Sequence, residues 1–252
     1  MSNRRAWAVL GFALLCHRTV CGAELRVAVA SNFFLPAQEI ATEFTRSTGH
    51  PVVFSRGSTG TLFAQITQGA PFDVLLSADR VHVQKLADQG LGVKTSAFTY
   101  ATGKLILWSA LPDFINDGGT ILETNRFKHL AVANPRLAPY GRAAREVLSQ
   151  MGLLKKIQPR LVLGENVLQT FHFVSTQSAE LGFISLSQVY EKNGQPKGSF
   201  WMVPQKYYSP IDQDGIILTR SKVKKIAEAF LAFLKSNGAR SIIENYGYSH
   251  GK

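Results

Sequence analysis

Short apolar runs alternate with amphipathic stretches along the chain from residue 25 onward, and this alternation restricts the fold more than any other feature. Residues 25–30 form the first run, and apolar residues then recur at helical spacing over 37–44. Further runs at 52–54 and 74–76 are each followed by a helical stripe that ends at a glycine. A strand followed by a helix, several times over, is the pattern of βα units. The sequence therefore predicts an α/β fold with parallel strands.

The same rhythm restarts at about residue 103 and gives a second series of elements. We expect strands and helices at 104–108, 130–133, 143–151, 166–175, 181–184, 200–203, 216–218 and 223–234. We interpret the two series as two α/β lobes, the first formed by residues 24–102 and 204–252 and the second by residues 103–203. Two crossings of the chain would then form a hinge, and ligands usually bind in a cleft between lobes. A single doubly wound domain is the alternative that the pattern leaves open.

The N-terminal segment, residues 1–23, is typical of a secretory signal. Arg4 and Arg5 precede eleven apolar residues at 6–16, and small residues follow before Glu24. The apolar run is shorter than the roughly 20 residues that span a bilayer. We expect cleavage after Ala23 and a periplasmic protein, which would lose both cysteines of the sequence and three positive charges. A buried first helix and a lipid anchor on one of the cysteines are the alternatives.

The charge balance is strongly basic, with 28 Lys and Arg against 17 Asp and Glu and a formal net charge of +11. Such an excess raises the possibility of an anionic partner, which could be nucleic acid, a membrane surface or a small anion. The basic residues are scattered, however, and the densest clusters lie at 155–156 and 222–225. This distribution favours a solvated surface. Together with export, it argues against a nucleic-acid partner.

Motifs for catalysis do not emerge from the sequence. Residues 56–60 resemble a nucleophile elbow around Ser58, but that elbow needs a glycine at the position of Arg56. Gly103-Lys104 lacks the other residues of a phosphate-binding loop, and the six histidines show no metal-ligand spacing. We therefore expect a protein that is not an enzyme and has no cofactor. An exported hydrolase that uses Ser58 is the alternative.

Polar residues stand at several points where a helix is predicted to begin. Ser31 and Asn32 follow the first strand, and Ser58 follows the second. Tyr140 and Val167 lie at two helix starts in the second series. The first N–H groups of a helix lack partners within the helix and favour anions. Because such turns gather at the carboxyl ends of parallel strands, these residues could meet at one site.

Helix capping alone would explain each of these polar residues taken singly. Four helix starts that converge on a cleft would instead surround an anion with neutral N–H and O–H donors. A site with donors and no acceptor favours a fully ionised oxyanion over a protonated one. The pattern therefore predicts a site for a sulfate-like dianion.

Several short motifs, taken together in this order, resemble the periplasmic molybdate-binding proteins, the ModA-type receptors of ABC importers. The resemblance extends over essentially the whole chain after residue 23. The motifs are Val29-Ala30-Ser31-Asn32-Phe33, Gly57-Ser58-Thr59-Gly60, Gln68-Gly69-Ala70-Pro71-Phe72-Asp73-Val74, Ser77-Ala78-Asp79, Ala133-Asn134-Pro135, Ala138-Pro139-Tyr140-Gly141, Gly164-Glu165-Asn166-Val167 and Glu180-Leu181-Gly182-Phe183.

The resemblance implies a two-lobed periplasmic-binding-protein fold of type II that closes like a venus flytrap on molybdate or tungstate. The metal would be held through its oxygens, without direct protein ligands, and a monomeric receptor would deliver the oxyanion to a membrane permease. The residues implied to bind the oxyanion are Ser31, Asn32, Ser58, Tyr140 and Val167. Some members place a tyrosine hydroxyl on the oxyanion from the strand after Gly182, and Ser185 stands at that place here.

The choice among tetrahedral oxyanions is not determined by the donors, because donors alone do not set the size of a cavity. Sulfate and chromate have the same shape as molybdate and tungstate. The preference for molybdate rests on the resemblance, and a receptor for another oxyanion such as sulfate is the alternative.

Overall fold

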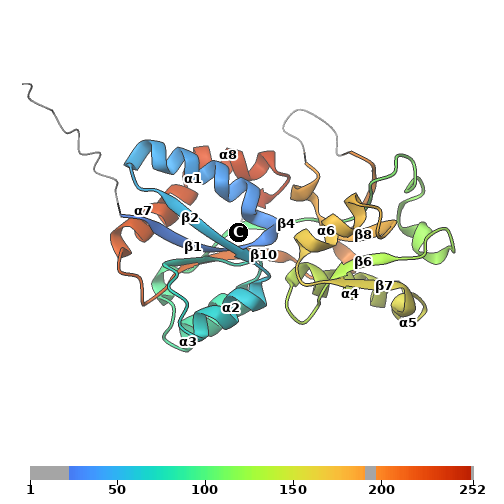
Figure 1. Ribbon diagram of the computed structural model, residues 1–252, viewed down its shortest axis with the longest axis horizontal. Helices are drawn as coiled ribbons and strands as arrows, with labels where there is room; N and C mark the ends of the chain where they lie inside the picture. Colours follow the sequence, from blue (N-terminus) through green and yellow to red (C-terminus); the bar gives the residue numbers. More distant parts are fainter. Residues whose placement is uncertain (1–22, 191–196, 251–252) are drawn as a thin grey trace, which may run out of the picture.

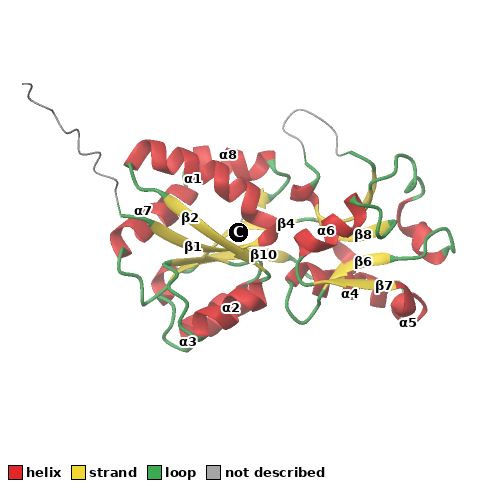
Figure 2. Ribbon diagram, viewed as in Figure 1, coloured by secondary structure: helices red, strands yellow, loops and turns green. Residues whose placement is uncertain are grey.

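The computed structural model describes residues 23–190 and 197–250, and it has two lobes that lie side by side (Figure 1). The predicted signal segment lies outside the described residues except for Ala23. Each lobe contains its own sheet, with helices on both faces (Figure 2). The α/β class and the two-lobed architecture are confirmed, and the alternative of a single doubly wound domain is wrong.

The first lobe is built on a six-stranded sheet with the order β11-β4-β10-β3-β1-β2. β1 pairs in parallel with β2 and β3, whereas β10 is antiparallel to β3 and β4. The strands are β1 (Leu25–Ala30), β2 (Val52–Gly57), β3 (Val74–Leu76), β4 (Phe98–Gly103), β10 (Ile211–Ile217) and β11 (Ser249–His250). The helices are α1 (Phe34–Thr48), α2 (Thr59–Thr67), α3 (Arg80–Asp88), α7 (Lys224–Leu234) and α8 (Asn237–Asn245).

The side chains of β1 point alternately to the two faces of this sheet, and apolar residues on each explain why helices cover both. Val27 and Val29 pack into a core with α1, α7 and α8, which lie together on one face (Figure 1). Ala28 points to the other face and packs with Leu62 of α2 and Leu86 of α3. Successive side chains of a strand point to opposite faces, so a strand buried on both sides is apolar on both, as β1 is after the exposed Arg26 near its start.

The second lobe has a five-stranded sheet with the order β7-β6-β8-β5-β9. β6 is parallel to β7 and β8, and β5 is antiparallel to β8 and β9. The elements are β5 (Leu105–Ser109), β6 (Leu130–Ala133), α4 (Pro139–Gln150), α5 (Leu154–Ile157), β7 (Leu161–Gly164), α6 (Val167–Ser175), β8 (Leu181–Ser185) and β9 (Ser199–Met202). The described residues also include six short 3-10 helices, at Ser31–Phe33, Lys94–Ser96, Gly118–Glu123, Gln158–Arg160, Leu186–Gln188 and Gln205–Tyr207.

The chain crosses between the lobes at two places. The first crossing joins β4 to β5 through Lys104, and the second runs from β9 to β10. Two adjacent crossings form a hinge about which two rigid lobes can rotate. The parallel strands of both lobes are followed by the starts of helices, and these starts lie where the lobes meet.

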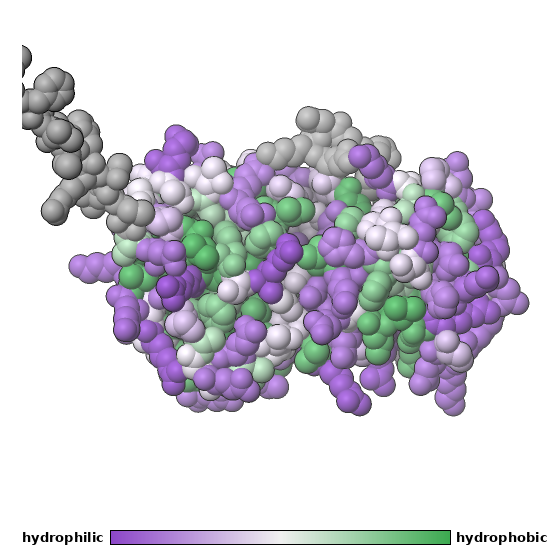
Figure 3. Space-filling model, viewed as in Figure 1, coloured by the Kyte–Doolittle hydropathy of each residue, from purple (hydrophilic) through white to green (hydrophobic). Residues whose placement is uncertain are grey.

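The exterior has hydrophilic side chains spread over both lobes on the face seen in Figure 3, with an apolar area near β7 and α5. Leu163 of β7 is 55% exposed. Within residues 23–190 and 197–250, no helix combines the length and apolar character needed to cross a membrane.

Candidate functional site

A small cavity lies between the lobes. Five of the six predicted site residues line it, and they come from both lobes. None of the described lining residues carries a charged side chain. The lining residues are Ala30, Ser31, Asn32, Gly57, Ser58, Thr59, Ala78, Ala138, Pro139, Tyr140, Asn166 and Val167.

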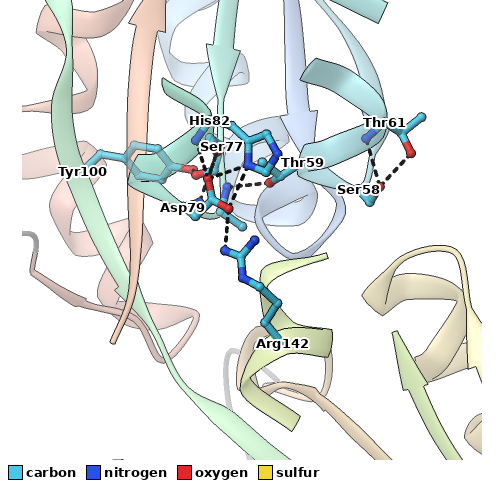
Figure 4. Close-up of polar contacts among 9 residues, drawn as sticks. Ser58, Thr59, Thr61, Ser77, Asp79, His82, Tyr100 and Arg142 are labelled. Carbon is cyan, nitrogen blue, oxygen red and sulfur yellow. Dashed lines mark hydrogen bonds and ion pairs between the residues drawn. The ribbon is translucent and has the colours of Figure 1, made fainter. Parts of the chain in front are cut away.

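Ser58 contributes a hydroxyl that both caps a helix and remains able to donate. It is the N-cap of α2, and its Oγ accepts from the backbone N–H of Thr61 at 3.3 Å. The Thr61 hydroxyl lies 2.7 Å from the same oxygen (Figure 4). When Thr61 donates both groups, the proton of the Ser58 hydroxyl is available to the cavity. Capping and oxyanion binding are therefore compatible functions of this serine.

Ser31 and Asn32 follow β1 in a single turn of 3-10 helix, and both are buried. The Ser31 hydroxyl donates to the carbonyl of Gly57 at 3.0 Å, and rotation about its Cα–Cβ bond would turn the same proton toward a ligand. The Asn32 amide donates instead to Gln213 Oε1 at 2.9 Å and to Tyr248 Oη at 3.0 Å. Because that amide is already used, the group that Asn32 can offer to a ligand is its backbone N–H.

The second lobe contributes two helix starts whose capping arrangements leave a backbone N–H available. Pro139 begins α4 and has no N–H of its own, so the first N–H of that helix belongs to Tyr140. Asn166 caps α6 by accepting from the N–H groups of Leu168 and Gln169 at 3.0 and 3.1 Å. This capping leaves the N–H of Val167, which is the first residue of α6. Each start thus presents a positive dipole end to the cavity.

Ser185 is the predicted site residue that does not line the cavity. It is buried at the end of β8, and its hydroxyl donates to the Tyr140 hydroxyl at 2.9 Å. Its Oγ also lies 2.8 Å from Ser187 Oγ. In this structure Ser185 therefore contacts the side chain of Tyr140, which lies behind the cavity, while the Tyr140 backbone faces the cavity.

A buried hydroxyl and amide network at the hinge connects the two lobes behind the cavity. Tyr248 Oη donates to the backbone carbonyl of Asn32 at 2.8 Å, and Ser187 Oγ from the second lobe donates to the same carbonyl at 2.8 Å. Gln213 donates to the Tyr140 hydroxyl at 3.4 Å. Burial raises the pKa of the Tyr140 and Tyr248 hydroxyls, so both phenols stay neutral and keep their protons for hydrogen bonds.

Gly103 makes this network possible because it lies where the chain crosses between the lobes. A Cβ at this position would overlap the Tyr140 hydroxyl and would lie 2.8 Å from Gln213 Nε2. The Tyr140 side chain therefore passes against bare backbone at the crossing. The network residues Gln213 and Tyr248 were not predicted from the sequence, since they are 181 and 216 residues away from Asn32 and no local pattern connects them.

A second polar cluster lies next to the cavity and is centred on Asp79, the N-cap of α3 (Figure 4). His82 Nδ1 lies 2.9 Å from Asp79 Oδ1, and Arg142 of the second lobe donates to Asp79 Oδ2 at 2.6 Å. Burial by itself raises the pKa of this carboxyl. The hydrogen bonds and charge of His82, with a further bond from Arg142, outweigh burial and lower the pKa to about 2. Asp79 is therefore an anion at neutral pH.

Metal-ion binding by side chains finds no support in the described parts of the chain, where no group of three or more His, Cys, Asp and Glu side chains is suitably placed. The cavity also holds no pair of nucleophile and base among its lining residues within those parts. What the arrangement offers is a set of neutral hydrogen-bond donors from both lobes.

Comparison with known proteins places these observations in a family. The family described as bacterial extracellular solute-binding protein matches residues 25–249. The molybdate-binding protein ModA of Azotobacter vinelandii is 48% identical over 226 residues, which cover 90% of each chain. That of Rhodobacter capsulatus is 45% identical over 240 residues, covering 95% of this chain and 92% of the relative. ModA of Escherichia coli is 28% identical over 261 residues, with 98% and 97% covered.

Solved structures give the same result. The periplasmic molybdate-binding protein of Azotobacter vinelandii superimposes with a TM-score of 0.89 at 40% identity, covering 90% of this chain and all of that one. The sulfate-binding protein SubI of Mycobacterium tuberculosis, at 11% identity and a TM-score of 0.75 over 91% and 87% of the chains, shares the fold alone. The chain thus belongs to the family of bacterial extracellular solute-binding proteins.

Proposed function

We propose that this chain binds molybdate, and also tungstate, between its two lobes and delivers the oxyanion to the permease of an ABC transporter. The observation that carries the proposal is the cavity itself, which is lined by hydroxyls and helix starts from both lobes and by no charged side chain among its described residues. The similarity to ModA proteins at 45% to 48% identity supports molybdate as the oxyanion.

The binding residues in this proposal are Ser31, Asn32, Ser58, Tyr140 and Val167. The two serines donate a hydroxyl and a backbone N–H each, and the other three donate a backbone N–H. A fully ionised tetrahedral oxyanion accepts hydrogen bonds on every oxygen and needs no acceptor in return, which fits a site made of donors. The N–H donors are fixed by the backbone, whereas the Ser31 hydroxyl must turn away from the Gly57 carbonyl to reach the ligand.

Binding requires both lobes, because neither supplies the whole set of donors. We assign residues 24–102 and 204–252 to the first lobe and residues 103–203 to the second. The lobes are in contact here: the N–H of Gly60 in α2 donates across the gap to the carbonyl of Leu137 at 2.9 Å. A ligand that contacts donors from both lobes stabilises this closed arrangement relative to an open one.

The protein is a transport receptor rather than an enzyme, and it uses no cofactor. As a member of an extracellular solute-binding family it acts outside the cytoplasm. We further propose that residues 1–23 are a cleaved signal peptide, that the mature protein is a periplasmic monomer, and that exposed charges around the cleft interact with the permease. Nucleic acid has no part in this function.

Isothermal titration calorimetry tests the proposal directly. Molybdate and tungstate should bind at one site per chain, and Ser31→Ala and Ser58→Ala should each weaken binding by about 1.5–3 kcal/mol, because each removes a donor to a charged group. Ser149→Ala, an exposed change on α4, is the control and should bind like the wild type. Absence of heat and of any thermal shift with molybdate, tungstate and sulfate would refute the proposal. Tight binding of sulfate alone would show that the receptor's oxyanion is sulfate and not molybdate.

A further inference from the structure

An ion pair connects the two lobes beside the cavity, and no group of the ligand site is part of it. Arg142 lies in the first turn of α4, two residues after Tyr140, and its Nη2 donates to Asp79 Oδ2 at 2.6 Å (Figure 4). The Asp79 side chain is 8% exposed and the Arg142 side chain 39%. Neither residue is among the described residues that line the cavity, although Ala78 and Tyr140 are.

The other contacts of Asp79 all lie within the first lobe. Its Oδ1 accepts from the His82 backbone at 3.0 Å as the cap of α3, and the His82 ring lies within 3.0 Å of both carboxylate oxygens. The Ser77 hydroxyl donates to the same Oδ1 at 3.5 Å. These contacts hold the carboxylate in place whether or not the lobes are together. Arg142 is the partner of Asp79 that comes from the second lobe.

Closure therefore changes the surroundings of the Asp79 carboxylate. When the lobes separate, Oδ2 is open to water, which solvates the charge. When the lobes close, that water is lost, and a buried carboxylate without a replacement partner is costly. The guanidinium of Arg142 supplies the replacement partner, so the pair stabilises the closed state relative to the open one.

The position of Arg142 connects this pair to the ligand. Arg142 and Tyr140 occupy the same turn of α4, so the contact that holds Arg142 on the first lobe also holds the Tyr140 N–H over the cavity. The neighbouring contact on the cavity side, Gly60 N–H to the Leu137 carbonyl, joins the same two parts of the lobes. The pair thus acts on ligand retention from outside the cavity.

We propose that Arg142 and Asp79 are positioning residues that hold the start of α4 against the first lobe in the closed state and thereby set the rate at which the bound oxyanion leaves. This inference rests on the proposed function. It assigns part of the affinity to a contact between protein groups that never touch the ligand. Such a contact slows opening and leaves the encounter of the open receptor with the oxyanion unchanged.

The test measures release of radiolabelled molybdate into excess unlabelled molybdate, together with the association rate, for the full chain and for Arg142→Gln. We expect release to accelerate about 5- to 20-fold while association changes less than about 2-fold. Arg145→Gln is the matched control, because it removes the same charge from an exposed side chain one turn further along α4. Its release rate should equal that of the wild type.

Asp79→Asn provides the second variant, since asparagine also caps helices and the start of α3 is then kept. It should accelerate release to a similar extent, and the double variant should release no faster than either single one, because both remove the same contact. The melting temperature without ligand should stay close to that of the wild type for Arg142→Gln, which separates a loss of closure from a loss of folding.

Two results overturn the inference. One is release from Arg142→Gln at the rate of Arg145→Gln, and the other is a double variant whose effects simply multiply. Both results are obtained with a wild-type protein that does bind molybdate. Failure of the wild type to bind would instead refute the proposed function.

Discussion

Gly60→Ala is expected to weaken oxyanion binding while leaving the unliganded protein as stable as before or more so. Gly60 is the second residue of α2, and its N–H donates to the Leu137 carbonyl of the opposite lobe at 2.9 Å. A Cβ at this position would lie 3.0 Å from the Leu137 oxygen and 3.1 Å from its Cα. Both atoms are backbone and cannot rotate away, so the closed lobes must move apart slightly.

The expected magnitude follows from two opposing terms. Overpacking at a close contact costs about 1–3 kcal/mol, and here the cost applies only to the closed state. This corresponds to a dissociation constant raised roughly 5- to 150-fold. In the open state the same Cβ meets no second lobe, and alanine is favoured over glycine in a helix by about 1 kcal/mol. The unliganded protein should therefore melt at the same or a higher temperature.

Isothermal titration calorimetry with molybdate gives the dissociation constant, and differential scanning calorimetry without ligand gives the melting temperature. Gly238→Ala is a closely matched control, because Gly238 is also the second residue of a helix, α8, and a Cβ there meets nothing within 4 Å. It should raise the melting temperature and leave the affinity unchanged. If Gly60→Ala binds molybdate as tightly as Gly238→Ala does, the lobes do not need this approach and the reasoning fails.

Two further predictions concern the groups around the cavity. Tyr140→Phe should lower the free energy of unfolding by about 1–3 kcal/mol in urea denaturation, because it removes the buried acceptor of the Ser185 hydroxyl and of the Gln213 amide; a neutral result would mean that the hydroxyl network does not stabilise the hinge. Asp79 has a pKa lowered to about 2, so its contribution to stability should be complete above its usual pKa of 3.8 and lost as the pH falls through about 2. The stability difference between wild type and Asp79→Asn should accordingly shrink between pH 4 and pH 2, and a constant difference over that interval would contradict the assignment.

The elements that the sequence predicted most accurately are those whose buried positions carry apolar residues. β1 and α1 were predicted closely because one is apolar on both faces and the other has a clear apolar stripe. β10 was predicted only at 216–218 and runs over Ile211–Ile217. Its first half carries Asp212, Gln213 and Asp214, whose polar groups bond across the sheet to Thr102, Tyr100 and Thr99. Polar residues that find partners only in the folded sheet leave no apolar signal.

The candidate site likewise combines residues that local sequence predicts with contacts that it does not predict. Ser58 and Asn166 could be placed at helix starts from local sequence, and both are N-caps in the structure. The Tyr140 and Val167 N–H groups were implied by the family resemblance, and the proline and the cap before them explain why these N–H groups are available. The pairing of Asp79 with Arg142 has no local signal, since 63 residues and the boundary between two lobes separate them.

The contacts between the lobes fall into two groups that should respond differently to opening. The network of Tyr140, Gln213 and Tyr248 packs against Gly103 at a chain crossing, where a hinge rotation moves atoms least. The contact of Gly60 and the pair of Arg142 with Asp79 join elements away from the crossing residues, and a rotation separates them first. The hinge network can then persist in both states and fix the axis, whereas the other two contacts belong to the closed arrangement of the lobes. Since only contacts that differ between two states shift their equilibrium, the affinity for the oxyanion should depend on this second group and on the donors of the cavity, and little on the hinge.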